Sequence, residues 1–185
     1  MAIFVTSNLQ LGRPGAIKKY NRNYDNVDQM TEDLILKWNE VVKQEDTVYH
    51  LGNFAWDPKT AQDALLRLNG RIYFTRGDHD KALEVLDEKG MLRNRVQMID
   101  CLTTLPELNL SLTYWPLKAW PNKRGKKAYN IIGYPEKKFK SDPKERIINV
   151  STDLWKNQPQ DLNKLLEKFS FTSFEKYLSK NNSFN

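Results

Sequence analysis

The sequence predicts an α/β protein in which two β-sheets pack together and helices flank them. In the first half of the chain, strand-like apolar segments alternate with helical patterns, which favours a parallel sheet with right-handed crossovers. From Val96 onward, short strands follow one another without helices, which indicates a second, largely antiparallel sheet. With 185 residues and 39% hydrophobic content, the chain is long enough for one domain with a substantial core.

The first half contains three predicted strands, over Ile3–Ser7, Thr47–Leu51 and Arg71–Thr75. Helices are predicted over 28–42 and 58–68, where apolar residues recur at helical spacing, and over 81–89, where Gly90 ends the helix. The second half contains four short predicted strands, over Val96–Leu102, Leu108–Tyr114, Tyr129–Ile132 and Ile147–Val150. These seven strands supply both sheets.

The chain has one cysteine, Cys101, which excludes an internal disulfide and a zinc site made of thiolates. It is expected to be a small buried hydrophobe on a strand. No apolar stretch approaches the roughly 20 residues of a membrane span, and Met1–Phe4 enters the first strand without a basic flank. We therefore expect a cytoplasmic protein with no membrane partner.

Polar side chains follow each of the first three strands, in the loops Asn8–Gly12, Gly52–Phe54 and Gly77–Asp80. In open α/β sheets such loops meet at one edge, so these side chains are expected at a common site. His50 precedes the second loop and is expected to be a hydrogen-bonded structural histidine. The loops have an alternative interpretation, in which the amides cap turns and Asp80 caps the next helix.

These segments resemble the calcineurin-like metallophosphoesterases, specifically the small bacterial and phage type. Its second motif, D-x-V-Y-H-L-G-D-F, is matched by Asp46–Phe54 except that Asn53 replaces the last aspartate. The other matching segments are Thr6–Gly12, Leu68–Asp80, Leu112–Leu117, Ile132–Glu136 and Asn149–Trp155. The resemblance implies a metallophosphoesterase-like sandwich of two mixed β-sheets flanked by helices. It covers a domain over 1–166, followed by a C-terminal helical extension over 167–185.

The resemblance also implies seven metal-ligand positions, and none of them carries the family's residue. The substituted positions are Asn8, Gln10, Asn53, Asp78, Tyr114, Tyr134 and Glu136. Only His79, which assists the transferred phosphoryl group in the family, and its neighbour Asp80 match. They are vestigial catalytic positions under this interpretation.

Neutral amides in place of carboxylates remove the negative charge that two dications need. Tyrosines become good ligands only after ionising from a pKa of about 10. We therefore expect no two-metal centre and no cofactor. Asp78, His79 and Glu136 could still hold one weakly bound Mg²⁺ or Mn²⁺.

Positive charge is concentrated between Lys118 and Ile147, where ten Lys or Arg residues stand against three acidic residues. Aromatic residues are interspersed among them, and the two loops of this region are expected to flank the metal-binding face. Such loops suit phosphate, nucleic acid or a protein partner, or are simply solvated. The candidate binding residues are Lys118, Trp120, Lys123, Arg124, Lys126, Lys127, Lys137 and Lys138.

Three functions are compatible with these observations. The first is a catalytically inactive pseudoenzyme that binds a protein partner. The second is a protein that binds nucleic acid or a phosphorylated nucleotide without hydrolysing it, and the third is a residual metal-dependent phosphodiesterase with a rebuilt site. Beyond Leu166, Phe171, Phe174, Tyr177 and Leu178 recur at helical spacing, a stripe expected to dock on its own domain.

Overall fold

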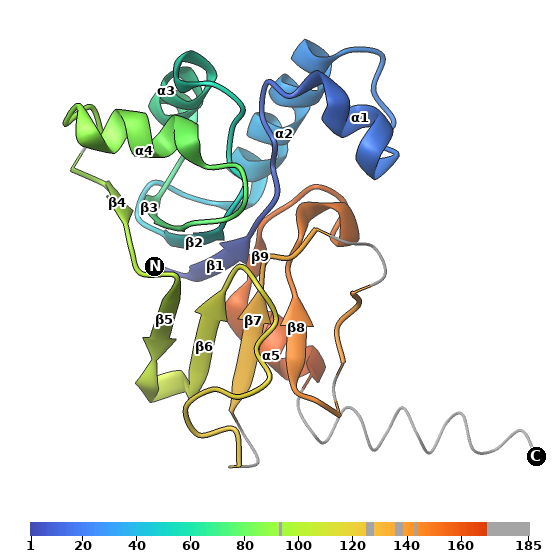
Figure 1. The fold of residues 1–185 in the computed structure, drawn as a ribbon, viewed down its shortest axis with the longest axis vertical. Helices are drawn as coiled ribbons and strands as arrows, with labels where there is room; N and C mark the ends of the chain where they lie inside the picture. The colour runs from blue at the N-terminus through green and yellow to red at the C-terminus, as the bar shows by residue number, and fades with distance from the viewer. Residues whose placement is uncertain (93, 125–127, 136–138, 143, 170–185) are drawn as a thin grey trace, which may run out of the picture.

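The structure is a computed structural model that describes residues 1–92, 94–124, 128–135, 139–142 and 144–169. It contains two β-sheets, one above the other in Figure 1, with four helices above the upper sheet. The upper sheet has the strand order β4-β3-β2-β1-β9 and the lower sheet β5-β6-β7-β8. The predicted fold class, an α/β sandwich of two mixed sheets flanked by helices, is confirmed.

The first sheet contains the three parallel strands that the sequence predicts and two further strands. Its strands β1 (Ile3–Thr6), β2 (Thr47–Leu51), β3 (Arg71–Thr75) and β4 (Val96–Met98) pair in parallel. A short fifth strand, β9 (Gln160–Asp161), adds to β1 in the antiparallel direction and makes the sheet mixed. Parallel pairing brings the ends of β1, β2 and β3 to one edge, where the candidate site lies.

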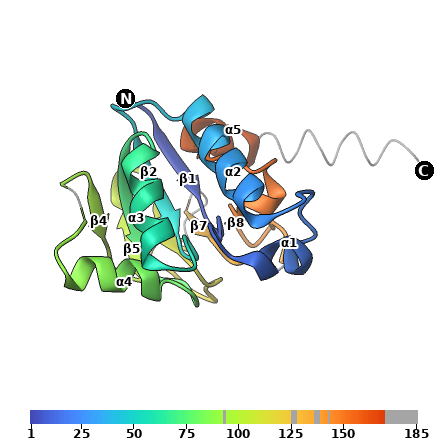
Figure 2. The same ribbon diagram turned by 90° about the horizontal axis from the view of Figure 1, so that it is seen from above.

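Four helices cover one face of this sheet: α1 (Pro14–Tyr20), α2 (Val27–Val41), α3 (Pro58–Arg67) and α4 (Lys81–Glu88). Seen from above in Figure 2, α3 and α4 lie over one half of the sheet, and α1 and α2 over the other. Asn26 and Asp57 cap α2 and α3 by accepting hydrogen bonds from the backbone N–H groups of Gln29 and Thr60. Only α1 escaped prediction, because its two turns are too short for a clear periodicity.

The second sheet contains β5 (Leu102–Leu105), β6 (Leu110–Thr113), β7 (Tyr129–Ile132) and β8 (Ile147–Asn149). Only β5 and β6 pair in antiparallel fashion, whereas β6–β7 and β7–β8 are parallel. The prediction of a largely antiparallel sheet was wrong. The described parts of the two parallel connections contain no helix, so the sequence offered no helical pattern that would have indicated parallel pairing.

The predicted strand over Val96–Leu102 is also wrong, because the chain passes from one sheet to the other within it. Val96–Met98 forms β4 in the first sheet, and β5 begins in the second sheet at Leu102. Cys101 lies in the connection and is exposed, where a buried position was expected. Cys101 is therefore not part of a buried strand, because it lies in the segment that links the two sheets.

The two sheets pack through the apolar faces that they turn toward each other. Val5 and Leu51 of the first sheet contact a cluster that includes Leu112, Ile131 and Ile148 of the second. The helix α5 (Leu162–Phe169) adds Leu162 and Leu165 to the same cluster. The helix α5 runs across residue 166, where the sequence analysis placed the end of the domain. The apolar stripe from Phe171 to Leu178 lies outside the residues that the structure describes.

Gly133 follows β7, where the second sheet lies against the ends of β1 and β2. A Cβ atom at this position would lie 1.9 Å from the carbonyl oxygen of Leu51 and 2.8 Å from the Cβ of Ser7. Only a residue without a side chain fits between β7 and the ends of β1 and β2. This glycine therefore fixes how closely the second sheet lies against the site-bearing edge.

His50, on β2, is buried among aromatic rings, 5.3 Å from Phe54 and 5.2 Å from Phe74 between ring centroids. Neither of its ring nitrogens has a hydrogen-bond partner among the described residues, so the predicted hydrogen-bonded histidine is wrong. Burial lowers the pKa of His50 to about 3. The imidazole is therefore neutral and acts as an aromatic packing residue.

We expect His50 to make the protein sensitive to acid. Unfolded His50 takes up a proton near pH 6.5 and folded His50 near pH 3, so the unfolded state binds more protons in this window. The free energy of unfolding should fall by up to about 1.4 kcal/mol per pH unit as the pH drops below about 6.5. His50→Phe should remove this slope in urea unfolding measured at about pH 7 and about pH 5.

The other histidine, His79, is partly exposed and provides the matched control. Because the pKa of His79 is also lowered, His79→Gln should remove part of the acid sensitivity, but less than His50→Phe removes, since His79 is not fully buried. If His50→Phe and the unmodified protein lose the same stability between the two pH values, His50 is not the group responsible.

Candidate functional site

The ends of β1 and β2 bring three amide side chains to one edge of the first sheet. Asn8 and Gln10 follow β1, Asn53 follows β2, and all three have left-handed backbone with φ of 60°, 57° and 60°. Asn adopts this conformation readily, whereas Gln does so rarely, so the loop holds Gln10 at some cost. All three side chains are buried.

These amides bond to one another and to a tyrosine. Asn8 Oδ1 accepts hydrogen bonds from Gln10 Nε2 at 2.8 Å and from Asn53 Nδ2 at 3.3 Å. Asn53 Nδ2 also donates to the hydroxyl of Tyr114 at 2.9 Å, and that hydroxyl donates to Asp78 Oδ2 at 3.0 Å. We call these five residues the amide network. It unites five of the seven positions that the resemblance assigned to metal ligands.

A buried ion pair lies behind the amide network. Asp153 Oδ2 accepts a hydrogen bond from Asn8 Nδ2 at 2.9 Å. The two carboxylate oxygens also accept hydrogen bonds from Arg22, at 2.8 and 3.0 Å. Arg22 also donates to the backbone carbonyls of Asn8 and Leu9, both at 2.6 Å. The side chains of Arg22 and Asp153 are 2% and 5% exposed. This pair orients the Asn8 amide, so that its oxygen faces Gln10 and Asn53.

Tyr114 fills the space between the turns that follow β2 and β3. A Cβ atom at Gly52 would lie 2.6 Å from its ring, and one at Gly77 would lie 2.9 Å from it. Burial, with the charge and hydrogen bond of Asp78 acting in the same direction, raises the pKa of Tyr114 far above its usual value. The phenol therefore stays protonated. The Tyr134 ring lies 5.9 Å away, at the edge of the network.

Asp80 joins the same two turns through its buried carboxylate. It accepts hydrogen bonds from the backbone N–H groups of Asn53 and Gly77 at 2.7 Å and of Phe54 at 2.8 Å. Burial raises the pKa of Asp80, while these three donors act in the opposite direction. Its side chain does not cap α4, contrary to the alternative interpretation from the sequence. Asp80 instead holds the loops together.

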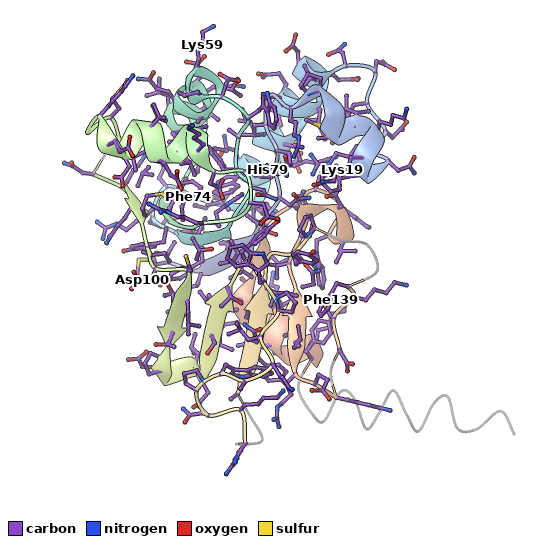
Figure 3. All side chains as sticks on the ribbon, viewed as in Figure 1. Lys19, Lys59, Phe74, His79, Asp100 and Phe139 are labelled. Carbon is purple, nitrogen blue, oxygen red and sulfur yellow. The ribbon has the colours of Figure 1, made fainter. Side chains whose placement is uncertain are left out.

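His79 lies at the surface of the site, near Lys19 of α1 (Figure 3). Its backbone N–H donates to Asn53 Oδ1 at 2.9 Å, and its ring lies 6.3 Å from that of Trp56. Burial, followed by the positive charges of Arg13 and Lys19, lowers the pKa of His79. The imidazole is therefore mostly neutral at pH 7.

Two exposed tryptophans stand beside the amide network. Trp56 is 52% exposed, and the guanidinium of Arg13 lies 4.7 Å over its ring while donating to Gln10 Oε1 at 2.8 Å. Trp115 is 42% exposed and packs edge-on against Tyr114 at 4.9 Å. We call Arg13, Trp56, His79 and Trp115 the aromatic rim.

The residues present do not fit a two-metal centre. The amides of Asn8 and Asn53 carry no charge, and their donors and acceptors are engaged with one another and with neighbouring residues. Tyr114 supplies a neutral phenol. Among the described residues, no three His, Cys, Asp or Glu side chains form a group that could hold a metal ion. Glu136, the third donor of the one-metal alternative, lies outside those residues.

Both loops of the basic region start beside the amide network, as expected, because Trp115 and Tyr134 lie against Tyr114. The described basic residues of the first loop, 115–124, which we call the basic loop, lie away from the network. Asn122 donates to Asn109 at 3.3 Å, and Arg146 donates to the carbonyl of Lys123. Asn109 and Arg146 directly precede β6 and β8, so this loop reaches the end of the second sheet where these strands begin, opposite the end that faces the amide network. Lys118 accepts a hydrogen bond from Lys123 Nζ at its carbonyl, at 2.8 Å. The candidates outside the described residues are Lys126, Lys127, Lys137 and Lys138.

Sequence reasoning missed Arg22 and Asp153 and, in the aromatic rim, Arg13, Trp56 and Trp115; His79 was predicted. Asp153 lay inside a matching segment, but 131 residues separate it from Arg22 and no local pattern pairs them. Trp115 lies inside the matching segment Leu112–Leu117 and Trp56 two residues after Asp46–Phe54, and these positions were the available signal.

The structure has a clear counterpart among solved structures. It matches the crystal structure of AQ665, a protein of unknown function from Aquifex aeolicus, with a TM-score of 0.65 and 17% sequence identity. The match covers 89% of this chain and 97% of that one, and it shows a shared fold. No helix in the described part of the chain is long and apolar enough to cross a membrane.

The sequence itself points to an archaeal relative. No family model matches the chain. The uncharacterized protein MJ1445 of Methanocaldococcus jannaschii is 31% identical to it over 175 residues, which cover 90% of this chain and 92% of that protein. Because the likeness spans nearly the whole of both, the chain belongs to the same family as MJ1445.

Proposed function

We propose that the protein is a catalytically inactive relative of the calcineurin-like metallophosphoesterases that binds a protein partner. The amide network carries this proposal. At the positions where the resemblance calls for metal ligands, neutral groups satisfy one another through hydrogen bonds of 2.8 to 3.3 Å. Such a site is stable without an ion and offers none of the charge that a dication requires.

The aromatic rim supports a protein partner. Trp, Tyr and Arg supply most of the binding energy at protein interfaces, and Trp56, Trp115 and Arg13 are grouped beside the amide network. Both tryptophans expose about half of their surface although each packs on a buried or half-buried neighbour. Large aromatic side chains held in place in this way lose little conformational entropy when a partner covers them.

Two readouts on the full chain test the proposed function. The first is calorimetric titration of the metal-stripped protein with Mn²⁺, with hydrolysis of bis-p-nitrophenyl phosphate assayed on the same sample and an active metallophosphoesterase as positive control. We expect neither tight binding nor turnover. Binding of two ions with turnover would refute the proposal, and activity abolished by Asp78→Ala would favour the residual phosphodiesterase.

The second readout concerns the partner. A protein retained by the immobilised chain is purified, and its affinity is then measured directly for each variant. Trp56→Ala and Trp115→Ala should each weaken binding by about 10-fold or more, as expected for interface hot spots. Leu66→Ala, which truncates a 47% exposed residue on α3, is the control and should bind normally. Unchanged affinity in both tryptophan variants would exclude the aromatic rim.

A second candidate function is binding of a phosphorylated ligand without hydrolysis. The observation that favours it is a basic pocket on the outer face of the second sheet, away from the amide network. Among the lining residues are Trp120, Lys123 and Arg124, which the sequence singled out.

A further inference from the structure

A pocket of about 520 Å³ lies where the basic loop covers the second sheet. Trp120 anchors this loop by packing with Ile132 and Ile147 on the outer face of β7 and β8. We call it the Trp120 pocket, and it is lined by Ala119, Trp120, Asn122, Lys123, Arg124 and Arg146. Its volume lies within the range of small-molecule sites.

Positive charge in the Trp120 pocket is only partly neutralised. Lys123 Nζ lies 3.4 Å from Glu145, a long contact to a side chain that is 61% exposed. Arg146 donates to the carbonyl of Lys123, but its Nε is buried and has no partner among the described residues. Arg124 is exposed and pairs with no carboxylate in the described part of the chain. Two guanidinium groups thus border one cavity without an anion.

Trp120 adds a second unsatisfied donor. The residue is only 7% exposed, and its indole N–H has no hydrogen-bond partner among the described residues. Because this nitrogen is buried from solvent, a ligand in the pocket does not reach it, and the guanidiniums of Arg124 and Arg146 remain as the ligand-binding groups. Lys123 Nζ lies 4.4 Å over the indole ring. Trp120 therefore forms part of the pocket wall and does not offer this face for stacking.

The backbone holds one lining residue in an unusual conformation. Arg146 has φ of 56°, in the left-handed region. Arginine is rare there, and strain of this kind clusters at ligand sites.

We propose that the Trp120 pocket binds a phosphate group, held by the guanidiniums of Arg124 and Arg146. Guanidinium groups match phosphate oxygens in geometry and form strong charge-assisted hydrogen bonds with them. Because the indole face is covered, recognition stops at the phosphate and does not extend to base stacking. This inference rests on the second candidate function and gives it a site.

Calorimetric titration of the full chain at low salt with inorganic phosphate tests the proposal. Phosphate should bind, 5′-AMP should bind at least as well, and adenosine should not. Arg124→Gln, which alters an exposed residue and should fold normally, should weaken phosphate binding by about 10-fold. Lys164→Gln removes one charge from an exposed position on α5 and should have no effect.

A thymidine oligonucleotide without a terminal phosphate distinguishes the sources of the group. If it binds no better than adenosine, the pocket takes the terminal phosphate of a small molecule. If it binds more tightly than 5′-AMP, with a steep dependence on salt, the pocket takes the backbone of a nucleic acid. No binding of phosphate, 5′-AMP or oligonucleotide, or equal binding by Arg124→Gln and Lys164→Gln, would overturn the proposal. The Mn²⁺ titration involves none of these residues, so the two proposals can fail separately.

Discussion

Replacing Asp153 with alanine is expected to lower the free energy of unfolding by about 3 to 5 kcal/mol. The substitution leaves the Arg22 guanidinium buried without its counter-ion, because the side chains of both residues are at most 5% exposed. It also removes the acceptor that fixes the amide of Asn8. Urea unfolding of the full chain measures the loss.

A surface ion pair provides the comparison for this result. Glu32 and Arg67 lie 2.5 Å apart with side chains 54% and 44% exposed, so Glu32→Ala should cost less than about 1 kcal/mol. The double substitution Arg22→Met with Asp153→Ala should recover part of the loss, since it removes the unpaired charge. If Asp153→Ala lowers the free energy of unfolding no more than Glu32→Ala does, the Arg22 guanidinium is hydrated or bonded to another group in the variant.

Restoring the family's carboxylate by Asn53→Asp is expected to destabilise the protein by about 3 kcal/mol. The change replaces the Nδ2 group, which donates to Asn8 and Tyr114, with an oxygen that faces Asn8 Oδ1. The buried carboxylate of the variant then faces the oxygen of Asn8, to which Asn53 donates a hydrogen bond, and it lies near the carboxylate of Asp78. The midpoint of urea unfolding at neutral pH measures the effect.

Asn109→Asp is the matched control for this substitution. Asn109 has the same left-handed backbone, with φ of 53°, but it is exposed and uses its side-chain oxygen as an acceptor. Its replacement should change the stability by less than about 0.5 kcal/mol. Equal stability of Asn53→Asp and the unmodified protein would mean that the site still accommodates a carboxylate, which would weaken the case for a lost metal centre.

The sequence was sufficient for the three central strands of the first sheet and for the grouping of the site positions. Alternation of strands and helices specifies parallel pairing, and parallel pairing alone brings Asn8, Asn53 and Asp78 to one edge. The second sheet was harder because the loops that link β6, β7 and β8 carry no helical pattern. The direction of such strands depends on where a loop ends, which periodicity does not encode.

Other features depend on partners that are distant in sequence. Arg22 and Asp153 meet across 131 residues, and each taken alone resembles an ordinary surface charge. His50 could be placed on a buried strand, but only the packed structure shows that Phe54 and Phe74 leave its nitrogens without partners. The basic loop was recognised by composition, whereas its location depends on how Trp120 packs on the second sheet.

Asp80 holds the backbone of the site in a fixed shape. Its carboxylate accepts hydrogen bonds from Asn53 and Phe54 of the turn after β2 and from Gly77 of its own turn, so the two turns can separate only if the first two bonds break. His79 lies in one of these turns, and Trp56 is two residues beyond the other. The surface between them is therefore preorganised, and a partner that docks there would find its shape already formed, with little ordering entropy left to lose.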